Sequence, residues 1–222
     1  MQTIPFFKAE THLRYLPHKS LRGLARRGQL IHYKSNTQII TQGQSGNEVF
    51  VVLDGRLEAY IHSNGRKERR LTLAVLQSGD IFGEIGIYGG PRSASVCTVE
   101  PTLCAMVAQA ELNEQRSIDA ELQELLTHTA NQRNRQNTQL MAQTLFNDIY
   151  TRMVDLLVSL ADKTSSQTMH ISDRVTHQEI ANRLGCSREM VSRLLKDLEK
   201  GQYISRREDR TLVLHPPLPV AW

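Results

Sequence analysis

The sequence predicts an α+β protein in which a β-rich first half, a long helix and a small helical domain follow one another. Short apolar runs separated by glycines fill the segment from about residue 38 to residue 110. Residues 110–161 contain no proline or glycine, and two short helical patterns joined by a glycine occupy residues 176–200. Each of these observations predicts one part of the fold.

The β-rich half carries the apolar runs EVFVVL, RLEAYI, RRLTLAVL and ASVCTV. Glycines recur between them at intervals of roughly one strand plus a turn. This spacing predicts an antiparallel β-roll or barrel. Ahead of it, several apolar residues have helical spacing and predict a small helix packed on the roll: Leu13, Leu16, Leu21, Leu24 and Ala25.

Residues 82–96, FGEIGIYGGPRSASV, contain the groups that a ribose phosphate needs. Gly83 lets the backbone approach a ligand, and a helical turn starting near Glu84 would direct free N–H groups at an anion. Arg92 supplies a delocalised charge that matches phosphate oxygens, and Ser93 adds a hydroxyl. Glu84 suits a sugar hydroxyl. The alternative is a pocket that has lost its ligand, with Glu84 and Arg92 paired as a structural salt bridge.

Residues 110–161 predict one long helix because helix-forming residues dominate. Its two apolar stripes are Ile118, Leu122, Leu125 and Leu126, and then Leu140, Met141, Leu145 and Ile149. The stretch NQRNRQNTQ between them has no aliphatic residue. It is either the exposed middle of an ordinary helix or a polar seam between two partner helices, whose amides gain partners when a ligand binds.

The C-terminal pattern predicts a helix-turn-helix. Thr176 and Glu179 form a capping box, and Gly185 suits the left-handed turn that ends the first helix. Ser187 is a good N-cap for the second helix. The buried stripes are expected at Ile180, Ala181 and Leu184, and at Val191, Leu194, Leu195 and Leu198.

The outward face of the second helix has the chemistry to read DNA bases. Arginine donates two hydrogen bonds to guanine, and glutamate accepts from the cytosine amino group. Arg188 and Glu189 lie in the first turn, which reaches furthest into a major groove, and Arg193 follows one turn later. Alternatively, Glu189 and Arg193 form an ordinary surface ion pair.

Two short apolar runs after this helix, Tyr203–Ser205 and Thr211–Leu214, predict a hairpin or wing. The arginines at its turn suit phosphate oxygens: Arg206, Arg207 and Arg210. A solvated turn is the equally open alternative.

The segment GCSREMVSRLLKDLE resembles the recognition helix of the cyclic-AMP receptor protein branch of the bacterial receptor-protein/fumarate–nitrate regulator family. The resemblance implies that Arg188, Glu189 and Arg193 read a TGTGA-like half-site, repeated as an inverted palindrome in double-stranded DNA. It also implies a phosphate contact for Ser187. The DNA-contacting residues expected on this surface are Thr176, Ser187, Arg188, Glu189, Ser192, Arg193, Arg206 and Arg207.

Residues 82–96 resemble the phosphate-binding cassette of cyclic nucleotide-binding domains, in a form shorter between Glu84 and Arg92. The resemblance implies that Glu84 holds the ribose 2′-hydroxyl and that Arg92 and Ser93 hold the cyclic phosphate, while Gly83 and Ile85 lend backbone groups. RMVDLLVSLA resembles the segment near the family's hinge, and counting back from it aligns Asn137 and Thr138 with an adenine-contacting pair.

The resemblance implies a homodimer with a cyclic nucleotide-binding domain over residues 1–110, a dimerisation helix over 111–148 and a winged helix-turn-helix domain over 149–222. Bound cyclic AMP would reposition the recognition helices. The loop over residues 162–169 would contact RNA polymerase. Cyclic di-GMP is the alternative effector, although the Arg92–Ser93 pair favours the mononucleotide.

Other function classes are a DNA-binding regulator that needs no effector, and a haem or redox sensor on the same scaffold. The histidines that such a sensor would use are His12, His18, His32, His62 and His128, without a diagnostic pair. No nucleophile–base set or glycine-rich hydrolysis loop indicates an enzyme. Cys97, Cys104 and Cys186 have no metal-ligand or disulfide spacing, which indicates a reducing cytoplasm and no metal.

The net charge of +4 fits a nucleic-acid partner only mildly. No apolar run reaches the roughly 20 residues that a membrane-spanning helix needs. The first residues, MQTIPFFKAETHLRY, lack the basic and apolar regions of a secretory signal. We therefore expect a cytoplasmic protein without a membrane partner.

Overall fold

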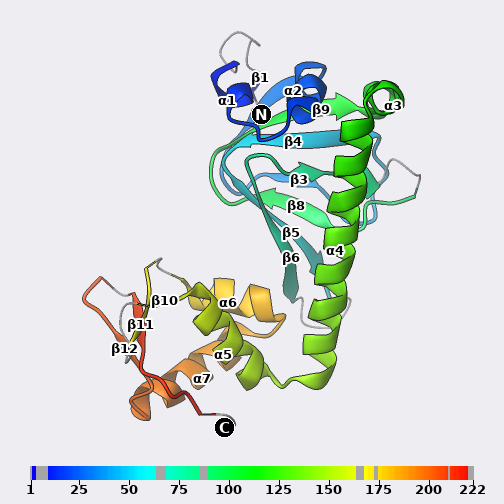
Figure 1. The fold of residues 1–222 in the computed structure, drawn as a ribbon. Coiled ribbons are helices and arrows are strands. Elements are labelled where there is room, and N and C mark those ends of the chain that lie inside the picture. Colours follow the sequence, from blue (N-terminus) through cyan, green and yellow to red (C-terminus); the bar gives the residue numbers. More distant parts are fainter. Residues whose placement is uncertain are drawn as a thin grey trace. The chain divides into compact units, whose positions relative to one another are not determined.

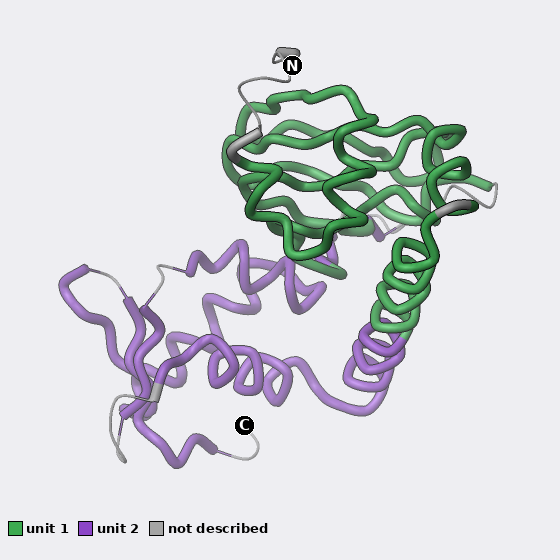
Figure 2. The backbone as a smooth tube through the Cα atoms, turned by 45° about the horizontal axis from the view of Figure 1, so that its top comes forward, with its two compact units in different colours: residues 1–61, 73–134 green, residues 62–72, 135–222 purple. Residues whose placement is uncertain are grey.

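The computed structural model describes residues 2–3, 10–63, 69–85, 90–163, 168–172, 175–209 and 211–219 (Figure 1). The chain forms two compact units, which Figure 2 distinguishes by colour. The first comprises residues 1–61 and 73–134, and the second comprises residues 62–72 and 135–222. The domain borders expected at residues 110 and 148 stay predictions.

The first half of the chain folds into two antiparallel sheets, which confirms the predicted β-roll. One sheet has the order β1 (Gln2–Thr3), β2 (Gln29–Tyr33), β9 (Thr102–Ala108), β4 (Glu48–Asp54) and β7 (Ile81–Phe82). The other has the order β3 (Gln38–Ile40), β8 (Ser95–Thr98), β5 (Arg56–His62) and β6 (Arg70–Gln77). The four apolar runs became β4, β5, β6 and β8. Strand β2 starts ahead of the segment in which the sequence predicted strands.

Apolar side chains fill the space between the two sheets. Phe50 of β4 and Phe82 of β7 stack with ring centroids 4.8 Å apart, and Leu57 and Val96 pack into the same cluster. This packing fixes the end of β7, the point from which the predicted phosphate-binding segment continues.

The other face of the first sheet is covered by helices. The predicted single small helix is in fact two helices, α1 (Glu10–Arg14) and α2 (Lys19–Arg26), whose leucines are buried with those of a later helix. All five apolar residues singled out in this region are buried: Leu13, Leu16, Leu21, Leu24 and Ala25.

The prediction of one helix over residues 110–161 is wrong in its extent. Three helices occupy this region: α3 (Gln109–Ile118), α4 (Ala120–Phe146) and α5 (Ile149–Leu160). Aspartates end the helical runs because a short carboxylate bonds the backbone N–H groups of the next helix. Asp119 accepts from the Leu122 N–H at 3.0 Å, and Asp148 accepts from the Thr151 N–H at 2.7 Å.

The apolar residues near the two ends of α4 differ in burial. Leu122 and Leu126 are buried in the core of the first unit. Toward the other end, Met141, Leu145 and Phe146 leave 64%, 73% and 84% of their surface exposed. Three large apolar side chains are therefore exposed near this end of α4.

The second unit contains the predicted helix-turn-helix, formed by α6 (His177–Leu184) and α7 (Arg188–Lys200). A sheet with the order β10 (Asp162–Lys163), β11 (Met169–Ile171), β13 (Leu212–Leu214) and β12 (Ile204–Arg206) lies in the same unit. The β12–β13 pair is the predicted wing. Among the described residues, no helix combines the length and the apolarity needed to cross a membrane.

The helix-turn-helix core follows the sequence pattern closely. Thr176 and Glu179 form the capping box, Gly185 has φ of +65°, and Ser187 accepts from the Met190 N–H at 3.2 Å. The buried residues include Ile180, Ala181, Leu184, Val191, Leu195 and Leu198, with Leu194 partly buried. These caps and contacts fix the direction of α7.

Candidate functional site

The predicted phosphate-binding segment begins where β7 ends. Gly83 has φ of +84°, and a Cβ there would lie 2.9 Å from both the Arg92 Nη1 and the Glu48 carbonyl oxygen. Glycine is therefore required on both conformational and steric grounds. A helical turn begins at Glu84 and Ile85, as expected, while residues 86–89, with Tyr88 and Gly89, lie outside the described residues.

Arg92 lies at the centre of this segment with 6% of its surface exposed. Its Nη1 donates to the Gly83 carbonyl at 2.8 Å. Its Nη2 donates to the Glu48 carbonyl at 2.9 Å and to the Glu48 carboxylate at 3.2 Å. The carboxylate beside Arg92 is thus that of Glu48, and the alternative of a Glu84–Arg92 salt bridge is wrong.

Glu84 is also buried, with 7% of its surface exposed, and its partner comes from α4. The Arg133 guanidinium pairs with the Glu84 carboxylate and donates to the Ile81 carbonyl. These bonds tie the long helix to the cassette. Neither Arg133 nor Glu48 was predicted from the sequence. The available signal for Arg133 was a cation in a polar stretch that lacks any aliphatic residue.

The remaining predicted ligand contacts are on the surface of the chain. Ser93 and Ile85 are exposed. Asn137 and Thr138 are exposed on α4, and Asn137 follows Arg133 by about one helical turn. The structure brings Gly83, Glu84 and Arg92 together, while contacts of the other four with a ligand stay predictions.

The predicted base-reading side chains lie together on α7. Arg188, Glu189 and Arg193 are exposed, and Ser192 shares the face of Arg188 because the two are four residues apart. Two of the residues predicted to contact DNA also cap helices. Thr176 uses its hydroxyl to accept from the Glu179 N–H at 3.2 Å, and Ser187 caps α7.

His177, at the start of α6, links the recognition helix to the wing. Its Nδ1 lies 2.7 Å from the Ser192 Oγ, and its Nε2 lies 3.1 Å from the Arg206 Nη2. The Arg206 Nε donates to the Glu199 carboxylate at 2.6 Å. Burial lowers the pKa of His177 below its ordinary 6.5, with further lowering by Arg206 and Arg188 and opposition from Glu199. His177 was not among the residues predicted from the sequence.

Two of the three wing arginines that were predicted to contact phosphates are described, and their surroundings differ. Arg206 is engaged by Glu199 and His177, whereas the Arg207 side chain is exposed. Asp209 shapes the turn by accepting from the Thr211 N–H at 2.9 Å. Arg210 lies outside the described residues.

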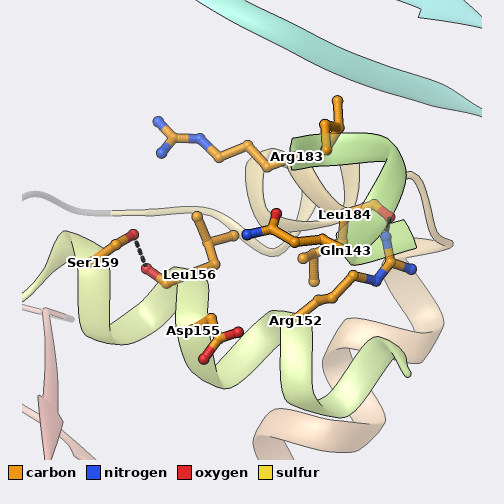
Figure 3. A pocket seen from close by; sticks show the side chains of 8 residues that line it. Gln143, Arg152, Asp155, Leu156, Ser159, Arg183 and Leu184 are labelled. Carbon is orange, nitrogen blue, oxygen red and sulfur yellow. Dashed lines mark hydrogen bonds between the residues drawn. The ribbon is translucent and has the colours of Figure 1, made fainter. Parts of the chain in front are cut away.

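A pocket of about 210 Å³ lies in the second unit (Figure 3). Its lining comes from α4, α5 and α6: Leu140, Gln143, Arg152, Asp155, Leu156, Ser159, Arg183 and Leu184. The guanidinium groups of Arg152 and Arg183 point to different sides in Figure 3, so they do not converge on one anion. Arg152 instead donates to the Leu184 carbonyl at 3.2 Å, which satisfies the last turn of α6.

Comparison with known proteins matches the β-roll and the helix-turn-helix to two known domains. Residues 30–119 match the cyclic nucleotide-binding domain, and residues 151–217 match the Crp-like helix-turn-helix domain. The chain is 30% identical over 191 residues to the cAMP-activated global transcriptional regulator Vfr of Pseudomonas aeruginosa, a match that covers 82% of this chain and 87% of Vfr. This chain belongs to the cyclic-AMP receptor protein/fumarate–nitrate regulator family.

A second curated relative and a solved structure match the chain with similar coverage. The cAMP-activated global transcriptional regulator CRP of Pasteurella multocida is 30% identical over 192 residues, covering 82% of this chain and 88% of that protein. The solved c-di-GMP-responsive global regulator CLP of Xanthomonas campestris superposes with a TM-score of 0.76 at 23% identity, covering 88% of this chain and 98% of CLP. Family members are transcriptional regulators, not enzymes.

Proposed function

We propose that this chain is a homodimeric transcription regulator gated by cyclic AMP. In this proposal the nucleotide binds the cassette at the end of β7, and the recognition helices then bind a palindromic, TGTGA-like operator. The observation that carries the proposal is the buried Arg92, which lies against Gly83 in a segment that also holds the buried Glu84. A buried guanidinium beside a glycine-lined backbone suits a phosphate monoanion.

Binding would exchange one anion at Arg92 for another. The Glu48 carboxylate is 46% exposed, so it can leave for solvent while the cyclic phosphate takes its place on the Arg92 Nη2. Ser93 would add a hydroxyl donor, and the Glu84 carboxylate would accept from the ribose 2′-hydroxyl. Gly83 and Ile85 would lend backbone groups.

Arg133 offers a route from the nucleotide to the long helix. When Glu84 accepts from a ribose hydroxyl, its carboxylate must bind Arg133 of α4 and the hydroxyl together, or the Arg133 side chain must move. Asn137 and Thr138, about one turn further along α4, would contact the adenine. A ligand that makes these contacts better in one arrangement of the helices shifts the population toward it.

The DNA half of the proposal rests on α7 and the wing. Arg188, Glu189 and Arg193 would read base edges, and Ser187 and Arg207 would contact phosphates. The exposed Met141, Leu145 and Phe146 provide the apolar surface for a second copy of the chain. Operator DNA as partner implies a cytoplasmic protein. An RNA polymerase contact at residues 162–169 stays a prediction, since residues 164–167 lie outside the described residues.

Calorimetric titration with cyclic AMP, cyclic GMP and cyclic di-GMP tests the proposal. The wild type should bind cyclic AMP most tightly and should then retain a TGTGA-palindrome duplex in an anisotropy assay. Arg92→Leu should abolish the heat, whereas Arg56→Leu, which removes a half-exposed arginine paired with Glu100, should leave it unchanged. A full response of Arg92→Leu would contradict the proposal.

A second candidate is a regulator that binds DNA without an effector. It is favoured by the arrangement of the site, because protein groups already satisfy both buried charges: Arg92 bonds Gly83 and Glu48, and Glu84 pairs with Arg133. Flat heats for all three nucleotides, together with unchanged operator binding, would support it. Cyclic di-GMP is the alternative effector, and the same titration separates it from cyclic AMP.

A further inference from the structure

His177 lies between two groups whose hydrogen-bonding roles differ. On one side, the Arg206 guanidinium can only donate, so the His177 Nε2 at 3.1 Å must accept. An imidazole whose Nε2 accepts carries its proton on Nδ1. The Nδ1–H therefore donates to the Ser192 Oγ at 2.7 Å, and the histidine is neutral.

The hydrogen-bonding role of the Ser192 hydroxyl follows from the tautomer of His177. Its oxygen accepts from Nδ1–H, so its own O–H remains to donate. Ser192 is half-buried on the helix face that also carries Arg188, and among the described residues its hydroxyl makes no other hydrogen bond. A serine in a helix otherwise switches between donor and acceptor, because its hydroxyl rotates freely.

We infer that His177 is a positioning residue that fixes the Ser192 hydroxyl as a hydrogen-bond donor toward DNA and thereby sets a base preference. The inference rests on the proposed DNA-reading role of α7 and deepens it. A fixed donor in the major groove favours bases that present acceptors there, such as guanine N7 and O6 or thymine O4. It disfavours the cytosine amino group, which is itself a donor.

The same bonds hold Arg206 back from the phosphates. Arg206 donates to Glu199 and to the neutral imidazole, so its charge is engaged within the protein. The charged groups that face His177 are Arg206 of β12 and Arg188 and Glu199 of α7. Protonation of Nε2 removes the acceptor for Arg206 while leaving the Nδ1–H bond to Ser192 intact. Acidification therefore removes one of the two acceptors of Arg206, while the Glu199 carboxylate stays paired with it and Ser192 stays a donor.

The tautomer is tested without DNA, by NMR of the imidazole nitrogens in the full-length protein. The His177 signals are assigned by their disappearance in His177→Phe. The expected spectrum at neutral pH has a protonated Nδ1 and an unprotonated Nε2. A protonated Nε2, or a charged ring at neutral pH, would overturn the inference.

The base preference is tested with a double-mutant cycle on a duplex carrying inverted TGTGA repeats and on its single-base variants, with cyclic AMP present. Ser192→Ala and His177→Phe should each flatten discrimination at the same base position by about 5- to 10-fold. The double variant should lose no more than either single variant, because both changes remove one donor. Multiplied losses, or a uniform loss of affinity with unchanged preference, would overturn the inference.

Two conservative variants separate positioning from folding. His177→Asn places an amide N–H where Nδ1 lies and should keep the base preference. His177→Gln reaches the Nε2 position, where it can bind Arg206, and should lose the preference. Thermal unfolding confirms that each variant folds. Wild-type protein that binds none of the duplexes would contradict the proposed function and the DNA-facing half of the inference, whereas the NMR result decides the tautomer independently.

Discussion

At the scale of single residues, Glu48 opposes the binding of any anion at Arg92. Its carboxylate lies 3.2 Å from the Arg92 Nη2, the position that a cyclic phosphate would take. Arg92 is buried and Glu48 is about half exposed, so solvent and salt screen their attraction from the Glu48 side only. In the proposed function, Glu48 therefore competes with the cyclic phosphate for Arg92 and lowers the nucleotide affinity.

Glu48→Gln should tighten cyclic AMP binding by roughly 2- to 5-fold, as expected for removing a partly exposed ion pair. Calorimetry measures the change directly. Glu100→Gln is the matched control, because Glu100 pairs with Arg56 on the surface at 3.8 Å and should leave the affinity unchanged. Weaker binding by Glu48→Gln would show that the carboxylate supports the site and does not compete for it.

Thr138→Ala should weaken cyclic AMP binding by roughly 3- to 10-fold, the range of one lost hydrogen bond. The DNA affinity of the ligand-free protein should stay unchanged, because Thr138 is proposed to act through the nucleotide. Calorimetry and anisotropy on the same preparation measure both quantities. Equal losses in both would contradict the proposed contact with the base.

At the scale of elements, aspartate caps decide where α4 and α5 begin. Asp148 starts α5 by accepting from the Thr151 N–H, and this bond is the main cause that lowers the pKa of the Asp148 carboxyl. Since the folded-state pKa is lowered, the cap stabilises the protein above the ordinary carboxyl pKa. The stabilisation disappears as the pH falls through the lowered value.

Asp148→Ala should lower the midpoint of thermal unfolding by a few degrees at neutral pH, because α5 loses its cap. Asp148→Asn should restore most of the loss, since asparagine also caps. The difference between wild type and Asp148→Ala should vanish in acid, once the carboxyl is protonated. Calorimetric scans over a pH series measure it, and a difference that persists in acid would rule out the charged cap as its origin.

At the scale of the whole molecule, the end of α4 leaves an apolar surface that a single chain does not cover. Met141, Leu145 and Phe146 are all well exposed, in contrast to the buried Leu122 and Leu126 of the same helix. A second copy of the chain is the partner that the proposed function assigns to this surface. Burying such side chains contributes about 1.5–3 kcal/mol each.

Phe146→Glu should shift the protein from dimer to monomer and reduce operator binding, because it places a charge in the apolar seam. Sedimentation velocity measures the association, and anisotropy measures the DNA binding. Tyr15→Glu changes another exposed aromatic residue, 78% exposed on the first unit, and should leave both unchanged. A dimer that survives Phe146→Glu at the same affinity would place the interface elsewhere.

The parts of the fold that the sequence predicted depend on short-range patterns. The capping box of Thr176 and Glu179, the left-handed Gly185 and the Ser187 cap act within a few residues of the chain, so spacing alone identifies them. The glycine spacing of the β-roll is equally local. Local pattern also explains why the predicted extent of the long helix was wrong. Asp119 and Asp148 lie among helix-forming residues, so the spacing does not reveal that they cap the helices that follow them.

The sequence alone predicted the order of the main segments, the caps of the helix-turn-helix, and the side-chain chemistry of the cassette and the recognition helix. The tertiary structure decided which charges meet. Arg92 pairs with Glu48 across 44 residues, Arg133 with Glu84 across 49, and Arg206 with His177 across 29. Local spacing carries no information about such pairs, because packing of distant elements selects one partner among many charged residues of the same type.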